Sequence, residues 1–374
     1  MRRGTKIQKL KQALPGIVKD VRHYAKPRVK LHNEGLGDYY TEGYRSLNQR
    51  EWKGVRDTAY DFASWLKVYG YMAVTLGKHP VALTKSFVRY PWMASYLTVA
   101  NMLDRHKLGL RGKQLRYTQE QFYGVVHNSV DVIAKIIERD ENLNSPNNKR
   151  AAKLRAKTVM FDEMTPSIIM AGFPMLDWID IAMSPVCLPG EVDQNANIMY
   201  VDAAERMGLA ADVCPLPSAE VGCAIVDDYP QVGSSFITSS MPCDGSLGAA
   251  LFMERYMKKL PSFTLTPPQR FNEPETNAYA VKDLKNCIRF IEETYDVKWD
   301  WDAFWKKAEE YNKTTQCMLD KWDVNCTPYP QVIGSALSLQ REYEFQTAAC
   351  LDSFMTKQDE KVTKMMLKGY EEDR

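Results

Sequence analysis

Apolar residues recur at helical spacing over much of the first half of this chain. Between residues 119 and 139 they lie three or four positions apart and predict an amphipathic helix, with an apolar stripe of Phe122, Val126, Val130, Ile133 and Ile137. A similar stripe predicts a helix over residues 60–71, and residues 1–158 are therefore expected to be mainly helical. Later helices are predicted at residues 197–207, 245–260, 277–294, 334–351 and 357–370. Asp302 is expected to cap one more helix, because Asp suits the N-cap position.

From residue 157 onward, short apolar runs alternate with helical segments. The strand candidates are residues 173–176, 221–226 and 236–240, and a helix that opens at Thr165-Pro166 is expected to end at Gly172. This alternation favours an α/β fold with a parallel sheet. A polar break at residues 142–150 favours a boundary between regions. The predicted regions are a helical part at 1–150, an α/β domain at 157–270 and a helical part at 271–374.

Composition and charge narrow the class of protein. The chain has 374 residues, of which 45% are hydrophobic and 26% charged, so a normal globular core is expected. A net charge of +2 argues against a general nucleic-acid binder. Residues 1–30 hold ten Lys and Arg residues and the single acid Asp20, which predicts either a solvated amino terminus or a basic arm. The sequence has no long uncharged apolar run, so no membrane span is expected.

The cysteines give the first pointer to chemistry. The chain has eight, with no Cys-x-x-Cys pair, which suits free thiols in a reducing cytoplasm. Cys243 follows a predicted strand and precedes a predicted helix, at the kind of sheet edge where α/β proteins place their chemistry. Cys214 offers a second loop thiol in Cys-Pro-Leu-Pro, and two such thiols are half of a metal or iron–sulfur site. The other six are expected to be small packing residues: Cys187, Cys223, Cys287, Cys317, Cys326 and Cys350.

Several segments, taken in order, resemble one enzyme family. Residues 165–174 (Thr-Pro-Ser-Ile-Ile-Met-Ala-Gly-Phe-Pro) are similar to the opening helix and strand of the 2-hydroxyacyl-CoA dehydratase and benzoyl-CoA reductase family. Cys214-Pro-Leu-Pro-Ser looks like its first cluster cysteine, and Ser-Ser-Met-Pro-Cys243-Asp looks like its second. Residues 279–312 look like the family's long helical region, and the resemblance covers about residues 159–370.

The resemblance implies a subunit of an oxygen-sensitive, anaerobic lyase with a [4Fe–4S] cluster, for which Cys214 and Cys243 are the candidate ligands. It also implies a homologous second subunit, an acyl-CoA substrate and an ATP-hydrolysing iron–sulfur activator that delivers one electron. The electron forms a ketyl radical on the thioester, and the hydroxyl group then leaves as water. Benzoyl-CoA reductases use similar subunits to reduce an aromatic ring, which is the alternative reaction. No catalytic residue is assigned.

The implied fold is a Rossmann-like or flavodoxin-like parallel-sheet domain followed by helices. In the family a second α/β domain usually supplies the third cysteine, and this sequence ends about where that domain is expected. The second domain is therefore expected to be absent, and the chain to be a fragment, a split subunit or a structural subunit without its own cluster. A weaker alternative is an RNA-associated or membrane-associated protein that binds through residues 1–30.

Overall fold

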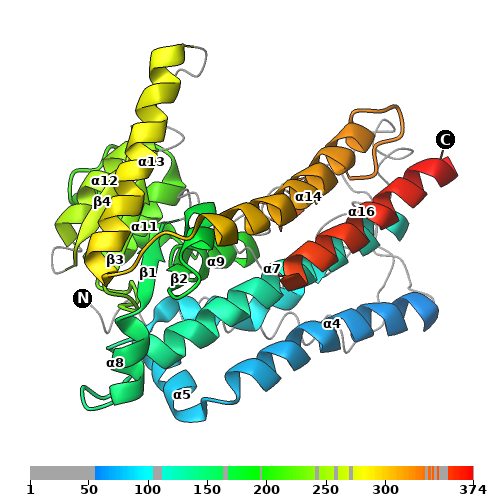
Figure 1. Ribbon diagram of the computed structural model, residues 1–374. Helices are drawn as coiled ribbons and strands as arrows, with labels where there is room; N and C mark the ends of the chain where they lie inside the picture. Colours follow the sequence, from blue (N-terminus) through cyan, green and yellow to red (C-terminus); the bar gives the residue numbers. More distant parts are fainter. Residues whose placement is uncertain are drawn as a thin grey trace. The chain divides into compact units, whose positions relative to one another are not determined.

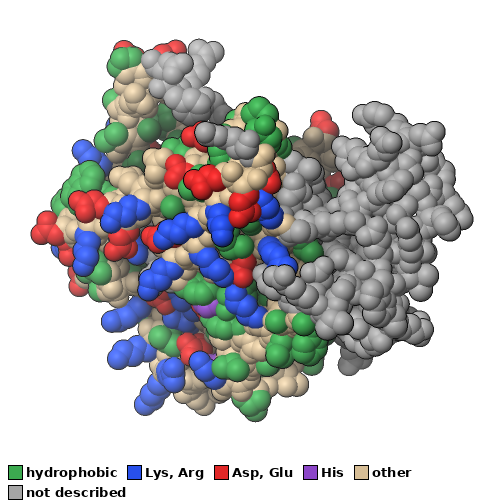
Figure 2. Space-filling model, turned by 90° about the vertical axis from the view of Figure 1, so that its right-hand side faces the viewer, with side chains coloured by type: hydrophobic (Ala, Val, Ile, Leu, Met, Phe, Trp, Pro, Cys, Tyr) green, Lys and Arg blue, Asp and Glu red, His purple; other side chains and the backbone are tan. Residues whose placement is uncertain are grey.

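The computed structural model describes most of the chain from residue 55 onward. The described residues are 55–103, 112–162, 167–193, 196–240, 244–256, 260–268, 273–332, 336–337, 339–340, 343–344 and 353–373. Within them no helix is both long and apolar enough to cross a bilayer. On the face seen in Figure 2, Lys and Arg side chains are interspersed with acidic and apolar ones. The basic residues 1–30 lie outside the described part of the chain.

The chain divides into two compact units. The described segments of the first unit are Leu76–Ser95 and Asp131–Ala308, and they include the sheet. The second unit combines residues 55–75 with Tyr96–Val130 and Glu309–Arg374, and its described secondary structure is helical. The predicted division of the chain near residues 150 and 271 stays a prediction.

A four-stranded parallel sheet forms in the described residues of the first unit (Figure 1). Its strands are β1 (Thr158–Phe161), β2 (Asp177–Asp180), β3 (Ser235–Ser239) and β4 (Ser262–Leu265), in the spatial order β2-β1-β3-β4. Every residue of β1 and β3 is buried, as expected for parallel strands covered on both faces. The predicted α/β fold with a parallel sheet is therefore confirmed, and so is the predicted strand at residues 236–240.

Helices connect and cover these strands. The α-helices of the first unit are α5 (Pro80–Arg89), α8 (Lys149–Arg155), α9 (Leu188–Val192), α10 (Ile198–Arg206), α11 (Pro215–Ile225), α12 (Asp244–Tyr256) and α13 (Pro274–Tyr295). The chain also forms the 3-10 helices η1 (Pro91–Leu103) and η2 (Ser167–Gly172) and the π-helical turn η3 (Met183–Cys187). The helices predicted at residues 197–207, 245–260 and 277–294 correspond to α10, α12 and α13, although α12 is described only as far as Tyr256.

One core packs α13 and η2 against the sheet. Its buried residues are Val159, Phe161, Ile169, Met170, Phe173, Ile237, Leu265, Cys287 and Ile291. Gly172 ends η2 as predicted, and a β-carbon there would collide with the indole ring of Trp299. Only part of the predicted apolar stripe on α13 is buried, because Ile291 is 0% exposed whereas Val281 is 50% exposed.

A second packing contact joins α10 to α11. Gly222 of α11 lies so close to the backbone of Tyr200 in α10 that a β-carbon would overlap the Tyr200 carbonyl group. The helix α11 also contacts α12, and α12 contacts β3. These contacts fix α11, whose residues 217–223 are all buried, beside the sheet.

Two strand predictions are wrong. Residues 173–176 form a turn before β2, in which the Leu176 N–H donates to the Phe173 carbonyl at 2.9 Å. Residues 221–226 belong to α11 and its carboxyl-terminal cap. A helix that is buried all round has no polar stripe, so its short apolar run reads like a strand.

The prediction that Asp302 caps a helix is also wrong, because the capping residue lies two positions earlier. The helix α14 (Trp301–Asn325) already includes Asp302 in its first turn. The Ala303 N–H donates to Asp300 Oδ1 at 3.0 Å, so Asp300 is the residue whose side chain caps the helix.

The second unit contains most of three long helices, α4 (Val55–Leu76), α7 (Gly112–Arg139) and α14, together with α16 (Ser353–Asp373). The side chain of Gln119 on α7 donates to Asp61 on α4 at 3.1 Å. Lys361 on α16 lies 2.7 Å from Glu120 on α7. These polar contacts tie the helices of the unit to one another.

A buried lysine joins α14 to α16. Lys321 is 0% exposed, pairs with the Asp359 carboxylate and lies 3.3 Å from Glu344 Oε1. Two carboxylates facing one ammonium group compensate its buried charge, as a buried ion requires.

Four predicted helices fall in or beside this unit. The stripe predicted at residues 119–139 is confirmed on α7, since its five apolar side chains are at most 1% exposed. The helix predicted at residues 60–71 is confirmed within α4, but it buries Val68 and Met72 and leaves Leu66 55% exposed. The helix at residues 357–370 is confirmed within α16, and most of residues 334–351 lie outside the described residues.

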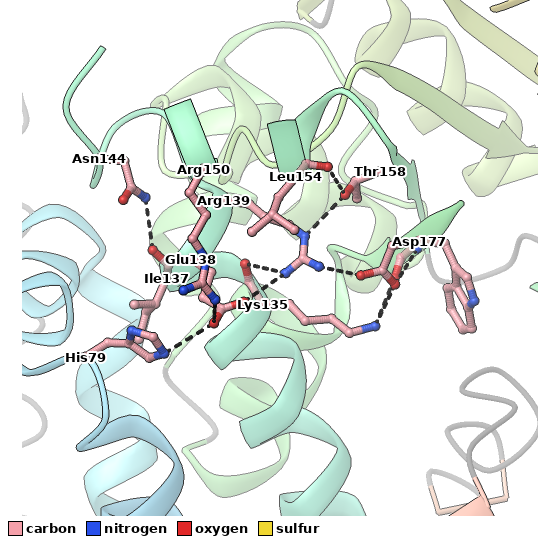
Figure 3. A network of polar contacts seen from close by, with 11 residues as sticks. His79, Lys135, Ile137, Glu138, Arg139, Asn144, Arg150, Leu154, Thr158 and Asp177 are labelled. Atoms are coloured by element: carbon pink, nitrogen blue, oxygen red, sulfur yellow. Dashed lines mark hydrogen bonds and ion pairs between the residues drawn. The ribbon is translucent and has the colours of Figure 1, made fainter. Parts of the chain in front are cut away.

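The amino edge of the sheet is closed by charged side chains from the end of α7 (Figure 3). Arg139 Nε donates to Thr158 Oγ1 at 3.2 Å, and the same guanidinium pairs with Asp177. Lys135 Nζ lies 3.0 Å from Asp177 Oδ1. Burial disfavours ionisation of Asp177, but Lys135 and Arg139 outweigh it and lower the pKa of that carboxyl group. Tyr295 completes this edge by donating to the Thr158 carbonyl at 2.7 Å.

Candidate functional site

Carboxyl groups mark the opposite, carboxyl edge of the sheet. Asp162 follows β1 directly, and Asp180 is the last residue of β2. Both are buried, at 7% and 6% exposed. The Ser239 N–H at the end of β3 donates to Asp162 Oδ2 at 3.3 Å, and the Ala182 N–H donates to Asp180 Oδ1 at 3.2 Å. Because parallel strands end on the same side, these groups gather where α/β sheets bind ligands.

The helix α11 and the segment after it carry further buried polar groups. Glu220 is 4% exposed, and Tyr229 is 1% exposed. Burial raises the pKa of the Tyr229 hydroxyl well above its usual value, and the charges of Glu220, Asp162 and Asp180 raise it further. The phenol of Tyr229 therefore stays protonated and lies within the electrostatic field of three carboxyl groups.

A network next to Tyr229 fixes the backbone at Asp228. The Tyr200 hydroxyl donates to Asp228 Oδ2 at 3.3 Å, and Arg89 Nη1 lies 3.3 Å from Asp228 Oδ1. The Trp92 indole N–H donates to the Asp228 carbonyl at 3.1 Å. These bonds from α5, η1 and α10 hold the segment that carries Tyr229 in a single position.

Of the two predicted ligand residues, the structure describes Cys214 but not Cys243. Cys214 is exposed, carries a free thiol and occupies the N-cap position of α11. Its carbonyl accepts a hydrogen bond from Ser218 Oγ at 3.0 Å. Cys243 lies outside the described residues, in the three-residue gap between Ser240 and Asp244, where α12 begins. Their joint role as ligands stays a prediction.

The remaining described cysteines fall into two groups. Cys187, Cys223 and Cys287 are buried, in agreement with the predicted packing role, and burial raises the pKa of Cys287 to about 12. Cys317 is half-buried and Cys326 is exposed, both on or next to α14. Among the described residues, no group of three or more His, Cys, Asp or Glu side chains is arranged to hold a metal ion.

The sequence reasoning missed the carboxyl groups and Tyr229. A local signal existed for two of them, because Asp162 and Asp180 each end a short apolar run, Val-Met-Phe-Asp and Trp-Ile-Asp. An acid at the end of a buried strand is a candidate for a sheet-edge site. Glu220 and Tyr229 gave no such signal, because neither residue ends a strand.

The fold and the site define an α/β protein with a parallel sheet and a polar carboxyl edge, beside which a helix begins at a free cysteine. A model of the family 2-hydroxyglutaryl-CoA dehydratase, D-component, matches residues 192–360. Residues 192–360 are therefore similar to this family, which confirms the predicted resemblance and supports a dehydratase-type subunit. The matched span includes Cys214, Glu220, Tyr229 and Cys243. A search of curated proteins finds no match.

Proposed function

We propose that this chain is a subunit of an iron–sulfur 2-hydroxyacyl-CoA dehydratase-type enzyme, in which Cys214 and Cys243 are two ligands of a [4Fe–4S] cluster. The family match carries this proposal, because it spans both cysteines. The exposure of the free Cys214 thiol supports it further, since a ligand must be reachable by the metal. No disulfide joins the described cysteines to one another, which supports a reducing compartment, the cytoplasm.

The described residues do not by themselves fit a cluster. A [4Fe–4S] cluster needs three or four thiolates, and the described part of the chain brings no three ligating side chains together. The proposal therefore requires Cys243 and a third ligand from outside the described residues. Its proposed partners are a homologous second subunit, an ATP-hydrolysing iron–sulfur activator and an acyl-CoA substrate. When bound, the cluster supplies one-electron chemistry at the thioester.

Metal content tests the ligand assignment. The full chain is purified without oxygen, together with any partner that co-purifies, and iron and acid-labile sulfide are measured per chain. We expect about four of each in the wild type, and clearly less in Cys214→Ser and in Cys243→Ser. The control is Cys326→Ser, which removes another exposed thiol and is expected to keep the wild-type iron content. Wild-type iron in both ligand variants would contradict the assignment.

A second candidate is a structural subunit without its own cluster. This alternative is favoured by the metal-ligand geometry, because no three metal-ligating side chains meet within the described residues. Under this alternative the partner-bound chain folds and assembles without iron. The metal analysis of the assembled wild-type complex therefore separates the two functions.

A further inference from the structure

Two tryptophans are exposed at the beginning of α14, in the first unit. Trp301 is 54% exposed and Trp305 is 60% exposed. They lie one turn apart on the same helix, and their rings stack with 6.4 Å between centroids and 24° between planes. Single exposed apolar side chains are normal on a protein surface, whereas adjacent ones that form a patch mark interaction sites.

A series of ring contacts joins this tryptophan pair to the core. Phe173, which is 0% exposed, packs edge-on against Trp299 with 5.2 Å between ring centroids. The ring of Trp299 in turn lies 5.4 Å from that of Trp301. The Asp300 N–H donates to the Gly172 carbonyl at 2.8 Å and ties the loop before α14 to η2. The pair is therefore held in place in the free protein, which lowers the entropy cost of binding a partner.

The chain around the tryptophan pair is acidic, although the whole protein carries a net charge of +2. Residues 292–302 contain five acidic side chains and one basic side chain, Lys298. Lys298 Nζ lies 3.7 Å from Glu292 Oε2, so its charge is balanced within the segment. The remaining acidic residues are all exposed: Glu293, Asp296, Asp300 and Asp302.

The combination of indole rings and carboxylates favours a cationic partner. An indole face attracts a cation through the electron density of the ring. A guanidinium group also stacks flat on such a ring and donates to a carboxylate through two N–H groups, which an ammonium group does not do. Nucleic acids and anionic lipid surfaces carry the same sign of charge as residues 292–302 and are repelled. The bases of the next turn, Lys306 and Lys307, lie about 100° and 200° around the helix from Trp305 and face other directions.

We propose that Trp301 and Trp305, with the exposed acids of residues 293–302, form a docking surface for an arginine-rich segment of a partner protein. Several arginines of one segment are required, because a single cation on one exposed ring binds weakly. Trp and Arg are also enriched among the residues that supply most of the binding energy at protein interfaces. The inference is independent of the proposed function, because it uses neither the cysteines nor the substrate.

Two peptides of equal charge test this proposal. The full chain is titrated with fluorescently labelled octa-arginine and octa-lysine, and binding is followed by fluorescence anisotropy. We expect octa-arginine to bind about threefold or more tightly than octa-lysine, because guanidinium groups stack on indole rings. The double variant Trp301→Leu/Trp305→Leu keeps apolar side chains but removes both rings. It is expected to weaken octa-arginine binding about tenfold, which corresponds to two cation–π contacts of about threefold each.

Variants of matched chemistry separate a local effect from a general one. Asp302→Asn removes one carboxylate beside the tryptophan pair and is expected to weaken octa-arginine binding about twofold. Glu275→Gln makes a similar charge change at the other end of α13, about 30 Å from the end that leads into α14. At about 0.1 M salt, charges farther apart than about 10 Å are screened, so Glu275→Gln is expected to keep the wild-type affinity. Tyr279→Leu removes an aromatic ring that is 50% exposed on α13, and it is also expected to keep that affinity.

Several outcomes would overturn the proposal. Wild-type affinity for octa-arginine in Trp301→Leu/Trp305→Leu, or an equal loss in Tyr279→Leu, would exclude a local role of the pair. Equal affinities for the two peptides would exclude a preference for arginine.

Two other occupants of the surface are tested in the same way. Binding of oligothymidylate that weakens in the double variant would make the surface a nucleic-acid site instead. Replacement of the ten Lys and Arg residues within residues 1–30 by Gln is expected to leave octa-arginine binding unchanged. Binding that becomes tenfold tighter after this replacement would show that the basic segment of the chain itself competes for the surface, and would overturn the assignment to a partner protein.

Discussion

The two edges of one sheet differ in how their polar groups are satisfied. At the amino edge, Arg139 and Lys135 meet the Asp177 carboxylate (Figure 3). Tyr295 donates to the Thr158 carbonyl at the same edge. By contrast, the Tyr229 hydroxyl group is buried in the electrostatic field of Glu220, Asp162 and Asp180 and has no hydrogen-bond partner. Charges with partners of opposite sign stabilise a fold, whereas an unsatisfied buried donor lowers its stability.

This difference separates the polar groups that stabilise the sheet unit from those that are available for binding. At the amino edge, ion pairs and hydrogen bonds in which both partners are present hold the strands together. Elsewhere in the same unit, the Tyr229 hydroxyl group is a buried hydrogen-bonding group that the protein does not satisfy. Variants that affect one edge and spare the other test this interpretation.

The largest effect is expected from Gly222→Ala, which disturbs the helix that carries Glu220. A β-carbon at Gly222 overlaps the backbone of Tyr200, and a backbone cannot move aside as a flexible side chain does. We expect a loss of about 3 kcal/mol in the free energy of unfolding, measured by urea denaturation. The matched control is Gly248→Ala in α12, where the nearest neighbour of the added β-carbon, Leu209 Cδ1, lies 3.8 Å away. That variant is expected to gain about 0.5–1 kcal/mol, and equal losses in both would refute the packing argument.

At the amino edge, Arg139→Leu is expected to destabilise the protein by about 2–3 kcal/mol, because it removes one partner of a largely buried ion pair. The Arg139 side chain is 6% exposed, and the Asp177 side chain is 34% exposed. Arg150→Leu is the control, since the Arg150 side chain is 78% exposed and pairs only at the surface with Glu138. Urea denaturation measures both variants, and similar stabilities would show that the buried pair contributes nothing.

The lowered pKa of Asp177 also predicts how the stability of the protein depends on pH. Its pKa is lowered in the folded protein, so its ion pairs stabilise the fold above its unfolded pKa and are lost as pH falls through the folded pKa. Asp177→Asn is therefore expected to be less stable than the wild type at pH 7. The difference should shrink as the pH falls from about 5 to 3. A difference that stays constant over this range would contradict the assigned role of the carboxylate.

The smallest effect, and the sharpest contrast, is expected from a pair of tyrosines. Tyr295→Phe removes a bonded hydroxyl group and is expected to cost about 1 kcal/mol of unfolding free energy. Tyr229→Phe removes a hydroxyl group without a partner, so its stability is expected to equal or exceed that of the wild type. A loss in Tyr229→Phe as large as that in Tyr295→Phe would mean that the Tyr229 hydroxyl group has a partner.

The sequence predicted those parts of the fold that carry one clear apolar stripe. The helix α7 was predictable because its five apolar side chains recur at helical spacing and are all buried. The strand β3 was predictable because a short apolar run ends at polar serines. The helix α11 was mistaken for a strand in part, because its residues 217–223 are buried on every side and show no period.

Residues of the candidate site could be predicted only where a short local motif in the sequence marks them. Cys214 and Cys243 each lie in a short local motif and drew attention for that reason. The charges of Glu220 and Asp162 act on Tyr229 only through the tertiary fold. Such proximity depends on topology and on the backbone contact at Gly222, and neither leaves a spacing pattern in the chain.

Hydrogen–deuterium exchange with and without lactoyl-CoA tests most directly the claim that the carboxyl edge is the binding edge. The full chain with its co-purifying partner is used, and exchange is followed by mass spectrometry. The account predicts slower exchange with lactoyl-CoA in peptides that cover α11 and Tyr229, and unchanged exchange in peptides that cover residues 131–139 and α8. Protection confined to residues 131–139 and α8, or no protection anywhere in the sheet unit, would contradict it.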